Sequence, residues 1–133
     1  MNQPLVSILI GTHNRANLIN KCLDSILRQN YKNLEIIVVN DASTDNTLEV
    51  LEEYVNKCEV KVINNNVNRG IAYNSNLAFS ISEGEYLALI GDDDEWCDQD
   101  KILHQVRAFK GNKKLGLVSP YWSDVKNGNI VKR

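Results

Sequence analysis

Three acidic residues in a row, Asp92, Asp93 and Asp94, follow the apolar run at residues 86–90 after the single residue Gly91. Carboxylates crowded at the mouth of a hydrophobic strand repel one another, and keeping them ionised is costly unless a cation neutralises them. Hard oxygen ligands suit Mg²⁺ or Mn²⁺, which bind one or two protein carboxylates together with phosphate oxygens and water. The run therefore predicts a metal-held diphosphate. The alternative is a solvated acidic loop whose aspartates cap the next helix.

Two other polar segments also follow apolar runs. They are Gly11-Thr12-His13-Asn14-Arg15, after residues 5–10, and Asn40-Asp41-Ala42-Ser43-Thr44-Asp45, after residues 34–39. In open parallel sheets, ligands bind beyond the carboxyl ends of the strands, and right-handed crossovers bring these ends to one edge. Asp41 is either a helix cap or a ligand to a base or ribose, and its position favours the ligand role. His13 is either an ordinary loop histidine or a ring that stacks on a base beside the charge of Arg15.

These polar segments need strands and helices to position them. Four runs rich in Val, Ile, Leu or Tyr predict buried strands at residues 5–10, 34–39, 60–63 and 86–90. Their continuous apolarity predicts a parallel sheet with both faces covered. Apolar residues with helical spacing lie between the runs, and helix starts are expected near Ser43 and Asp98. The sequence thus predicts an α/β domain of order β-α-β-α-β-α-β-α.

The last part of the chain has a different pattern. Residues 115–118 predict a further strand, and Asn127-Gly128 predicts a tight turn between Val125 and residues 130–131. The chain ends at Arg133, shortly after this second arm begins, so we expect it to be truncated at the C-terminus.

Composition limits the function classes. A chain of 133 residues that is 43% hydrophobic can bury one core, so we expect a single domain over residues 1–133. A net charge of -2 gives no long-range attraction to nucleic acid or to an anionic membrane. The cysteines, Cys22, Cys58 and Cys97, are odd in number and scattered, which is typical of reduced thiols. With no signal-peptide pattern and no long apolar span, a cytoplasmic protein is expected, with any peripheral membrane contact at the inner face.

Taken in order, the motifs resemble the family 2 glycosyltransferases of the GT-A fold. The matching segments are VSILIGTHNR at residues 6–15, VNDASTD at 39–45, Asn68-Arg69-Gly70 leading to Asn76, and Gly84-Glu85-Tyr86 leading to Asp92-Asp93-Asp94-Glu95-Trp96. The resemblance implies a Rossmann-like, three-layer α/β/α GT-A fold with a mostly parallel central sheet. It also implies sugar transfer from a nucleoside-diphosphate sugar, with UDP favoured, to a saccharide or glycolipid hydroxyl. Transfer would invert the anomeric carbon with the help of Mg²⁺ or Mn²⁺.

The resemblance also implies residue roles. Thr12 and His13 match the loop that lines the base, and Asp41 matches the carboxylate that hydrogen-bonds it. Asp92 matches a position near the ribose, and Asp93 matches the principal metal ligand. We favour Asp92 and Asp93 as the metal-binding pair, with Asp94 as a third candidate. Other expected donor contacts within the matched segments are Asn14, Arg15, Gly70 and Asn76.

The sequence departs from the family pattern at three single positions. Gly11 stands where many relatives have proline, Gly91 where they often have the first Asp of the acidic motif, and Ser75 where many have arginine. The first change affects the stiffness of the loop after the strand. The other two leave the exact acidic pair open and remove one potential phosphate contact.

The largest departure concerns the general base, which the family carries in its C-terminal half. No residue after Trp96 clearly matches it, and Asp124 is only a nominal candidate. We therefore expect the general base to lie beyond Arg133. The chain as it stands is then expected to bind donor and to transfer sugar poorly or not at all.

Other function classes explain the motifs less well. A non-catalytic module that binds sugar nucleotides or a partner is the main alternative. A sugar nucleotidyltransferase would need a glycine-rich basic loop after the first strand, and residues 11–15 are a poor version of it. A nicotinamide-dependent dehydrogenase is disfavoured because no G-x-G-x-x-G follows that strand. A phospho-acceptor domain would need a lysine after a late strand, where Ser119-Pro120 stands instead.

Overall fold

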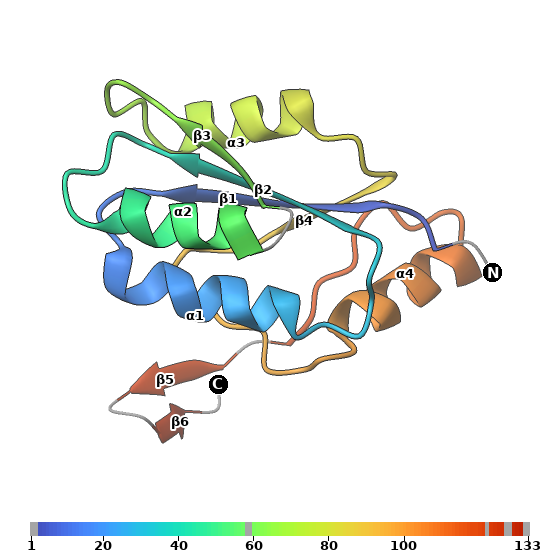
Figure 1. Ribbon diagram of the computed structural model, residues 1–133. Coiled ribbons are helices and arrows are strands. Elements are labelled where there is room, and N and C mark those ends of the chain that lie inside the picture. Colours follow the sequence, from blue (N-terminus) through green and yellow to red (C-terminus); the bar gives the residue numbers. More distant parts are fainter. Residues whose placement is uncertain (1–2, 58–59, 122, 127–128, 132–133) are drawn as a thin grey trace.

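The computed structural model describes residues 3–57, 60–121, 123–126 and 129–131. A parallel sheet is sandwiched between α3 on one face and α1 and α2 on the other, so the fold has the expected three layers (Figure 1). The elements are β1 (Val6–Thr12), α1 (Ala16–Leu27), β2 (Leu34–Asn40), α2 (Thr47–Lys57), β3 (Val60–Asn64), α3 (Ile71–Ile81), β4 (Tyr86–Leu89), α4 (Lys101–Gly111), β5 (Asp124–Lys126) and β6 (Asn129–Val131). The predicted alternation of strands and helices is confirmed.

The order of the strands decides where a ligand can bind. The sheet runs β3-β2-β1-β4, and every pairing in it is parallel. After β1 the chain moves outward to β2 and β3, and then returns to place β4 on the other side of β1. The connections from β1 and from β4 therefore diverge at their carboxyl ends, and such a switch point opens a crevice in α/β sheets. The expected polar segments lie at this edge.

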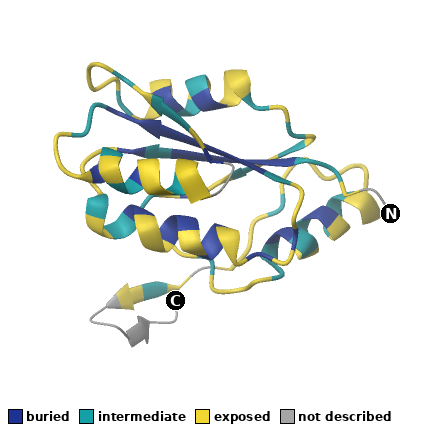
Figure 2. Cartoon of the chain, viewed as in Figure 1, coloured by how far each residue is buried: buried dark blue, intermediate teal, exposed yellow. Residues whose placement is uncertain are grey.

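The core explains why the strands are so apolar. Ile8 and Ile10 on β1 are buried against Ile19, Leu23 and Ile26 of α1, and the central strands form the continuous buried layer in Figure 2. On the opposite face a smaller cluster packs under α3. Burying such side chains contributes about 1.5–3 kcal/mol each.

The edge strand β4 corrects one expectation. Its apolar run predicted cover on both faces, but Leu87 is 45% and Leu89 71% exposed. Their neighbours Ala88 and Ile90 pack into the core on the α1 side. The other face stays open because α3 packs mainly over β1 and β2. The apolar composition of β4 does not show whether one face of the strand is covered or both.

The predicted strand at residues 115–118 is wrong, because the structure has no strand there. Leu117 is 81% exposed, and the Val118 carbonyl accepts a hydrogen bond from the side chain of Gln105 rather than from a neighbouring strand. A strand needs a ladder partner, and this segment has none among the described residues. The predicted hairpin is confirmed as the antiparallel pair β5 and β6, although its turn at residues 127–128 lies outside the described part of the chain.

Helix α2 begins at Thr47, four residues after the expected start at Ser43. The Asp45 carboxylate accepts the Thr47 N–H at 3.0 Å, so the cap lies later and residues 41–45 form a loop. No helix in the described part of the chain is long and apolar enough to cross a bilayer.

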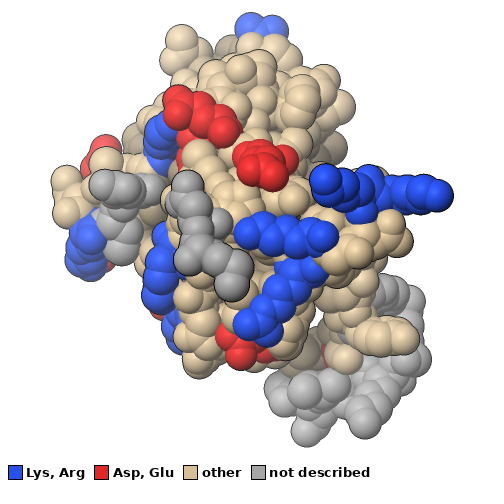
Figure 3. Space-filling model, turned by 90° about the vertical axis from the view of Figure 1, so that its right-hand side faces the viewer, with Lys and Arg blue, Asp and Glu red and all other residues tan. Residues whose placement is uncertain are grey.

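The end of the sheet away from the switch point is held by a buried carboxylate. Glu35, 8% exposed, accepts hydrogen bonds from Ser7 Oγ, the Glu83 N–H and Lys61 Nζ. Gly84 packs so closely that an added Cβ would lie 2.5 Å from the Ser7 nitrogen. Figure 3 shows this end of the molecule, where both signs of charge are interspersed. The far end thus anchors the loop that leads into β4.

Candidate functional site

The switch point brings the segments after β1 and β4 together. Arg15 Nε lies 3.9 Å from Asp92 Oδ1, and the two side chains are 47% and 15% exposed. The Arg15 N–H donates to Thr47 Oγ1 at 2.9 Å, which ties the same loop to the start of α2. A partly exposed ion pair of this length contributes little stability. Its value here is that it places a cation at the edge of the acidic run.

The acidic run folds back over Gly91. A Cβ added at Gly91 would lie 3.0 Å from Asp93 Oδ1 and 3.0 Å from Asp94 Oδ2, so one oxygen of each carboxylate lies beside Gly91. The turn is closed by the Asp94 N–H, which donates to the Gly91 carbonyl at 3.1 Å. The expected metal-binding pair, Asp92 and Asp93, with Asp94 as a third candidate, stays a prediction.

The described residues contain no group of three His, Cys, Asp or Glu side chains arranged to hold a metal ion. Two carboxylates from the acidic run would nevertheless provide the kind and number of protein ligands that Mg²⁺ ordinarily uses, with phosphate and water supplying the rest. The donor set therefore fits a metal that arrives with a diphosphate.

The loop after β1 is fixed by the side chain of Asn14. This residue has a positive φ of 54°, and its Oδ1 accepts the N–H groups of Thr44 at 2.7 Å and Asp45 at 3.3 Å. His13 Nδ1 lies 2.7 Å from the Asp41 carbonyl, and its Nε2 lies 3.2 Å from Asn14 Nδ2. Because a carbonyl only accepts, Nδ1 carries the proton and Nε2 accepts from the amide. Asn14 thereby sets both the loop and the orientation of the His13 ring.

Asp41 is 3% exposed and already has several donors. Its Oδ1 accepts from Asn65 Nδ2 and the Arg69 N–H, and its Oδ2 accepts from the Gly70 N–H, each at 2.8 Å. Burial by itself raises the pKa of Asp41, but hydrogen bonds from Arg69, Asn65, Asn74 and Gly70 outweigh it and lower the pKa to about 2. The carboxylate therefore ties the end of β2 to the start of α3.

Sequence reasoning missed the two asparagines of this network. Asn65 Nδ2 also donates to Asn74 Oδ1 at 2.8 Å, and Asn74 is buried on α3. One signal could have revealed it: Asn74 lies four residues before Ala78, on the face of α3 that packs against the sheet. A polar residue on such a face needs a partner.

Two residues at the end of β1 face different layers. Thr12 is 3% exposed, and its Oγ1 is the buried side-chain polar atom without a hydrogen-bond partner in the described part of the chain. An unpartnered buried hydroxyl is costly, so Thr12 is poised to accept or donate to a ligand. Gly11 lies beneath α3, where an added Cβ would meet Ile71 Cδ1 at 3.1 Å. The proline of many relatives would compete with Ile71 for this space.

The remaining expected donor-site residues lie further from the acidic run. Gly70 caps α3 with a φ of 81°, a conformation that glycine adopts without strain. Asn76 is exposed on α3. Among the residues expected at the donor site, the structure thus joins Arg15 to Asp92, and His13 and Gly70 to Asp41.

The general base is not located by the structure. Asp124, its nominal candidate, lies on β5 of the separate two-stranded hairpin. Arg133, beyond which the sequence analysis expects the base, lies outside the described residues. The position of the base beyond Arg133 therefore stays a prediction.

Comparison with known proteins identifies the family of this chain. The sequence matches the model for Glycosyl transferase family 2 over residues 7–133. The chain belongs to this family. It is 40% identical over 116 residues to a chondroitin synthase of Pasteurella multocida, covering 86% of this chain and 12% of that protein. It is 35% identical over 118 residues to the UDP-Glc:alpha-D-GlcNAc-diphosphoundecaprenol beta-1,3-glucosyltransferase WfaP of Escherichia coli, covering 89% and 46%.

Solved structures show the same fold in other glycosyltransferases. The mannosyltransferase PcManGT from Pyrobaculum calidifontis, in complex with GDP-Man and Mn²⁺, matches with a TM-score of 0.76 and 28% identity, over 81% of this chain and 33% of that one. S. aureus TarS 1-349 in complex with UDP matches with a TM-score of 0.70 and 31% identity, over 80% and 32%. The expected GT-A fold is confirmed. The chain spans less than half the length of each of these relatives.

Proposed function

We propose that this family 2 chain provides the donor site of an inverting glycosyltransferase, which binds a nucleoside-diphosphate sugar together with Mg²⁺ or Mn²⁺. One observation carries the proposal: the acidic run follows β4 at the carboxyl end of the sheet, with one carboxylate oxygen of Asp93 and one of Asp94 beside Gly91. This is the sheet's switch point, where α/β folds bind ligands. The nearby Arg15 side chain supplies positive charge on the same edge.

The residues around the acidic run have complementary roles in this proposal. Asp93 is the principal metal ligand, Asp94 supports it, and Asp92 lies near the ribose while it pairs with Arg15. When bound, the metal neutralises negative charge on the departing diphosphate. Arg15 adds a second cation for the phosphates, and the Thr12 hydroxyl offers a hydrogen bond at the end of β1.

The nucleobase is proposed to bind where β1 and β2 end. His13 presents a ring whose orientation is fixed by Asn14, and Asp41 lies beside it with both carboxylate oxygens already hydrogen-bonded. A base can still share an Asp41 oxygen, because each carboxylate oxygen has about two lone-pair sites. Relatives are described with UDP and with GDP-Man, so uridine is favoured and guanosine is the alternative to test.

The acceptor in this proposal is the hydroxyl of a saccharide or glycolipid. Its deprotonation requires a general base within hydrogen-bond reach, and no residue after Trp96 clearly matches the base of the family in sequence. We therefore place the base beyond Arg133, and we expect the 133-residue chain alone to bind donor without rapid transfer.

Calorimetric titration tests the donor site directly. The purified chain is titrated with UDP, GDP and dTDP, with Mn²⁺ and with EDTA, and the experiment is repeated on Asp93→Ala. Metal-dependent binding of one nucleotide, lost in this variant, is the expected result, because removal of the main ligand leaves only Asp94 on the metal. Glu52→Ala, on the exposed face of α2, is the control and should bind as the unmodified chain does. A folded chain that binds none of the nucleotides would favour the non-catalytic interaction module instead.

A further inference from the structure

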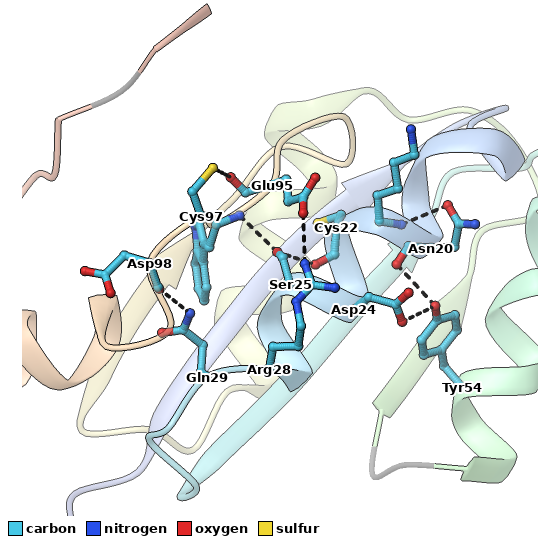
Figure 4. Close-up of polar contacts among 12 residues, drawn as sticks. Asn20, Cys22, Asp24, Ser25, Arg28, Gln29, Tyr54, Glu95, Cys97 and Asp98 are labelled. Carbon is cyan, nitrogen blue, oxygen red and sulfur yellow. Dashed lines mark hydrogen bonds and ion pairs between the residues drawn. The ribbon is translucent and has the colours of Figure 1, made fainter. Parts of the chain in front are cut away.

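One face of α1 is turned toward the acidic segment. Cys22, Ser25 and Arg28 follow one another at spacings of three residues, so they lie along one side of the helix, and Gln29 stands beside the last of them. Figure 4 shows this row of side chains facing the chain from Glu95 to Asp98. The helix thus contacts the segment that carries the carboxylates, although the two are about 70 residues apart in the sequence.

Two partly buried hydrogen bonds lie on either side of the acidic run. Cys22 Sγ donates to the Gly91 carbonyl at 3.4 Å, immediately before Asp92. Ser25 Oγ accepts the Trp96 N–H at 3.0 Å, immediately after Glu95, and donates its own proton to the Cys22 carbonyl at 2.7 Å. Both helix residues are 0% exposed. The four acidic residues therefore span the gap between two fixed backbone points.

Further contacts hold the segment that follows. Gln29 Nε2 donates to the Asp98 carbonyl at 2.7 Å, while its Oε1 accepts the Ile102 N–H at 3.2 Å. Lys101 Nζ lies 3.9 Å from the centre of the Trp96 ring. The Gln29 contacts attach the start of α4 to the residues just after α1, and the Lys101 contact attaches it to Trp96. The chain after the acidic run is therefore anchored as well as the chain before it.

Holding both ends of the acidic run matters because its carboxylates repel one another. Adjacent ionised carboxylates lower their mutual energy by moving apart, which would carry Asp93 and Asp94 away from a shared metal. Fixing the backbone at both ends limits that movement. Packing alone does not explain the arrangement, because an apolar side chain at Ser25 would fill the space but leave the Trp96 N–H without its acceptor.

We propose that Cys22 and Ser25 are positioning residues, which hold the acidic run so that Asp93 and Asp94 meet at the metal. The proposal rests on the donor-site function above, since it names residues that act through the metal ligands. Groups bonded to metal ligands typically change metal affinity by about 10–100-fold when they are removed. Cys22 and Ser25 contact the backbone on either side of the ligands instead, so an effect at the low end of this range is expected. The effect should therefore appear in metal-dependent binding, even though neither side chain touches the nucleotide.

Ser25→Ala tests the proposal, with Ser80→Ala as a matched control. Ser80 on α3 makes the same kind of hydrogen bond within its helix, from Oγ to the Leu77 carbonyl at 2.7 Å, and lies on a different face of the sheet. Each chain is titrated with UDP and GDP, with Mn²⁺ and with EDTA, and Mn²⁺ binding is followed independently by its electron paramagnetic resonance signal. Ser25→Ala should weaken Mn²⁺-dependent binding by about 10-fold and leave the EDTA titration unchanged. Ser80→Ala should leave both unchanged.

Cys22→Val provides a second test that does not depend on the folding of Ser25→Ala. Valine keeps an apolar side chain of similar size in the core but cannot donate to Gly91, so Mn²⁺-dependent binding should fall by roughly threefold. Unchanged Mn²⁺ binding in a folded variant would overturn the proposal, and so would an equal loss with EDTA, which would indicate a general structural role. If the unmodified chain itself shows no Mn²⁺-dependent binding, the donor-site function fails together with this inference. If the unmodified chain and both variants show equal Mn²⁺-dependent binding, the inference is overturned and the donor-site function stands.

Discussion

Asp41→Asn should destabilise the fold as well as disturb the proposed base site. The substitution keeps the size of the side chain but replaces one carboxylate oxygen with an NH₂ group, which is itself a donor. Oδ1 faces the Arg69 N–H and Oδ2 faces the Gly70 N–H, so either orientation of the amide points a donor at a donor. The attachment of the loop before α3 to the end of β2 is then lost.

The magnitude follows from the lowered pKa of Asp41. Hydrogen bonds outweigh burial and take this pKa from 3.8 to about 2. Since a tenfold change in proton affinity corresponds to about 1.4 kcal/mol, ionised Asp41 contributes about 2 kcal/mol to the free energy of unfolding. Because the folded pKa lies below the unfolded one, this contribution is fully present above about pH 5. It is lost as the pH falls through the folded value, and most of it is gone near pH 2.

Urea denaturation of the unmodified chain and of Asp41→Asn, at pH 7 and at pH 3, measures this directly. The free energies of unfolding should differ by about 2 kcal/mol at pH 7 and by roughly half as much at pH 3. Asp24→Asn is the control, because the exposed Asp24 accepts the Tyr54 hydroxyl and an amide oxygen can do the same. An equal difference at both pH values, or none at pH 7, would refute the assignment of this stability to the ionised carboxylate.

Two further predictions concern buried positions. Burial, and after it the charges of the neighbouring aspartates, raises the pKa of the Cys22 thiol to about 12. Iodoacetamide at pH 8 should therefore label the exposed Cys97 and leave Cys22 unlabelled until the chain unfolds. Peptide mass spectrometry of the native chain checks this, and rapid native labelling of Cys22 would contradict it. Gly84→Ala should cost about 1–3 kcal/mol, because its Cβ would lie 2.5 Å from the Ser7 nitrogen. Gly111→Ala, with no atom within 4 Å of its Cβ, should not destabilise the chain in the same thermal unfolding assay.

The strands and helices that position the site were largely predictable. Apolar runs and helical stripes located all four strands of the parallel sheet and its helices, because burial requires those patterns. The failures have physical causes. Residues 115–118 have the composition of a strand but no ladder partner among the described residues, and the run at β4 is covered on one face only. Both depend on neighbours that a local pattern does not contain.

The candidate site was predictable in its residue types and less so in its contacts. The position of the acidic run after a strand pointed to the switch-point edge, and the structure places it there. The approach of the Asp93 and Asp94 carboxylates to Gly91 could not be predicted, because it depends on a backbone turn at that residue. The buried partners of Asp41, Asn65 and Asn74, come from a loop and a helix whose sequence resembles ordinary polar surface.

The sequence by itself determined the family, the α/β architecture and the edge of the sheet where chemistry is concentrated, because all three depend on periodicity and on motifs that are local in the chain. The tertiary structure alone decided which polar groups meet. Cys22 and Ser25 reach the acidic run across about 70 residues of sequence, and Asp41 meets Gly70 across 29. Such contacts depend on the order of the strands and on which way each helix face turns. Sequence spacing fixes neither until the chain has folded.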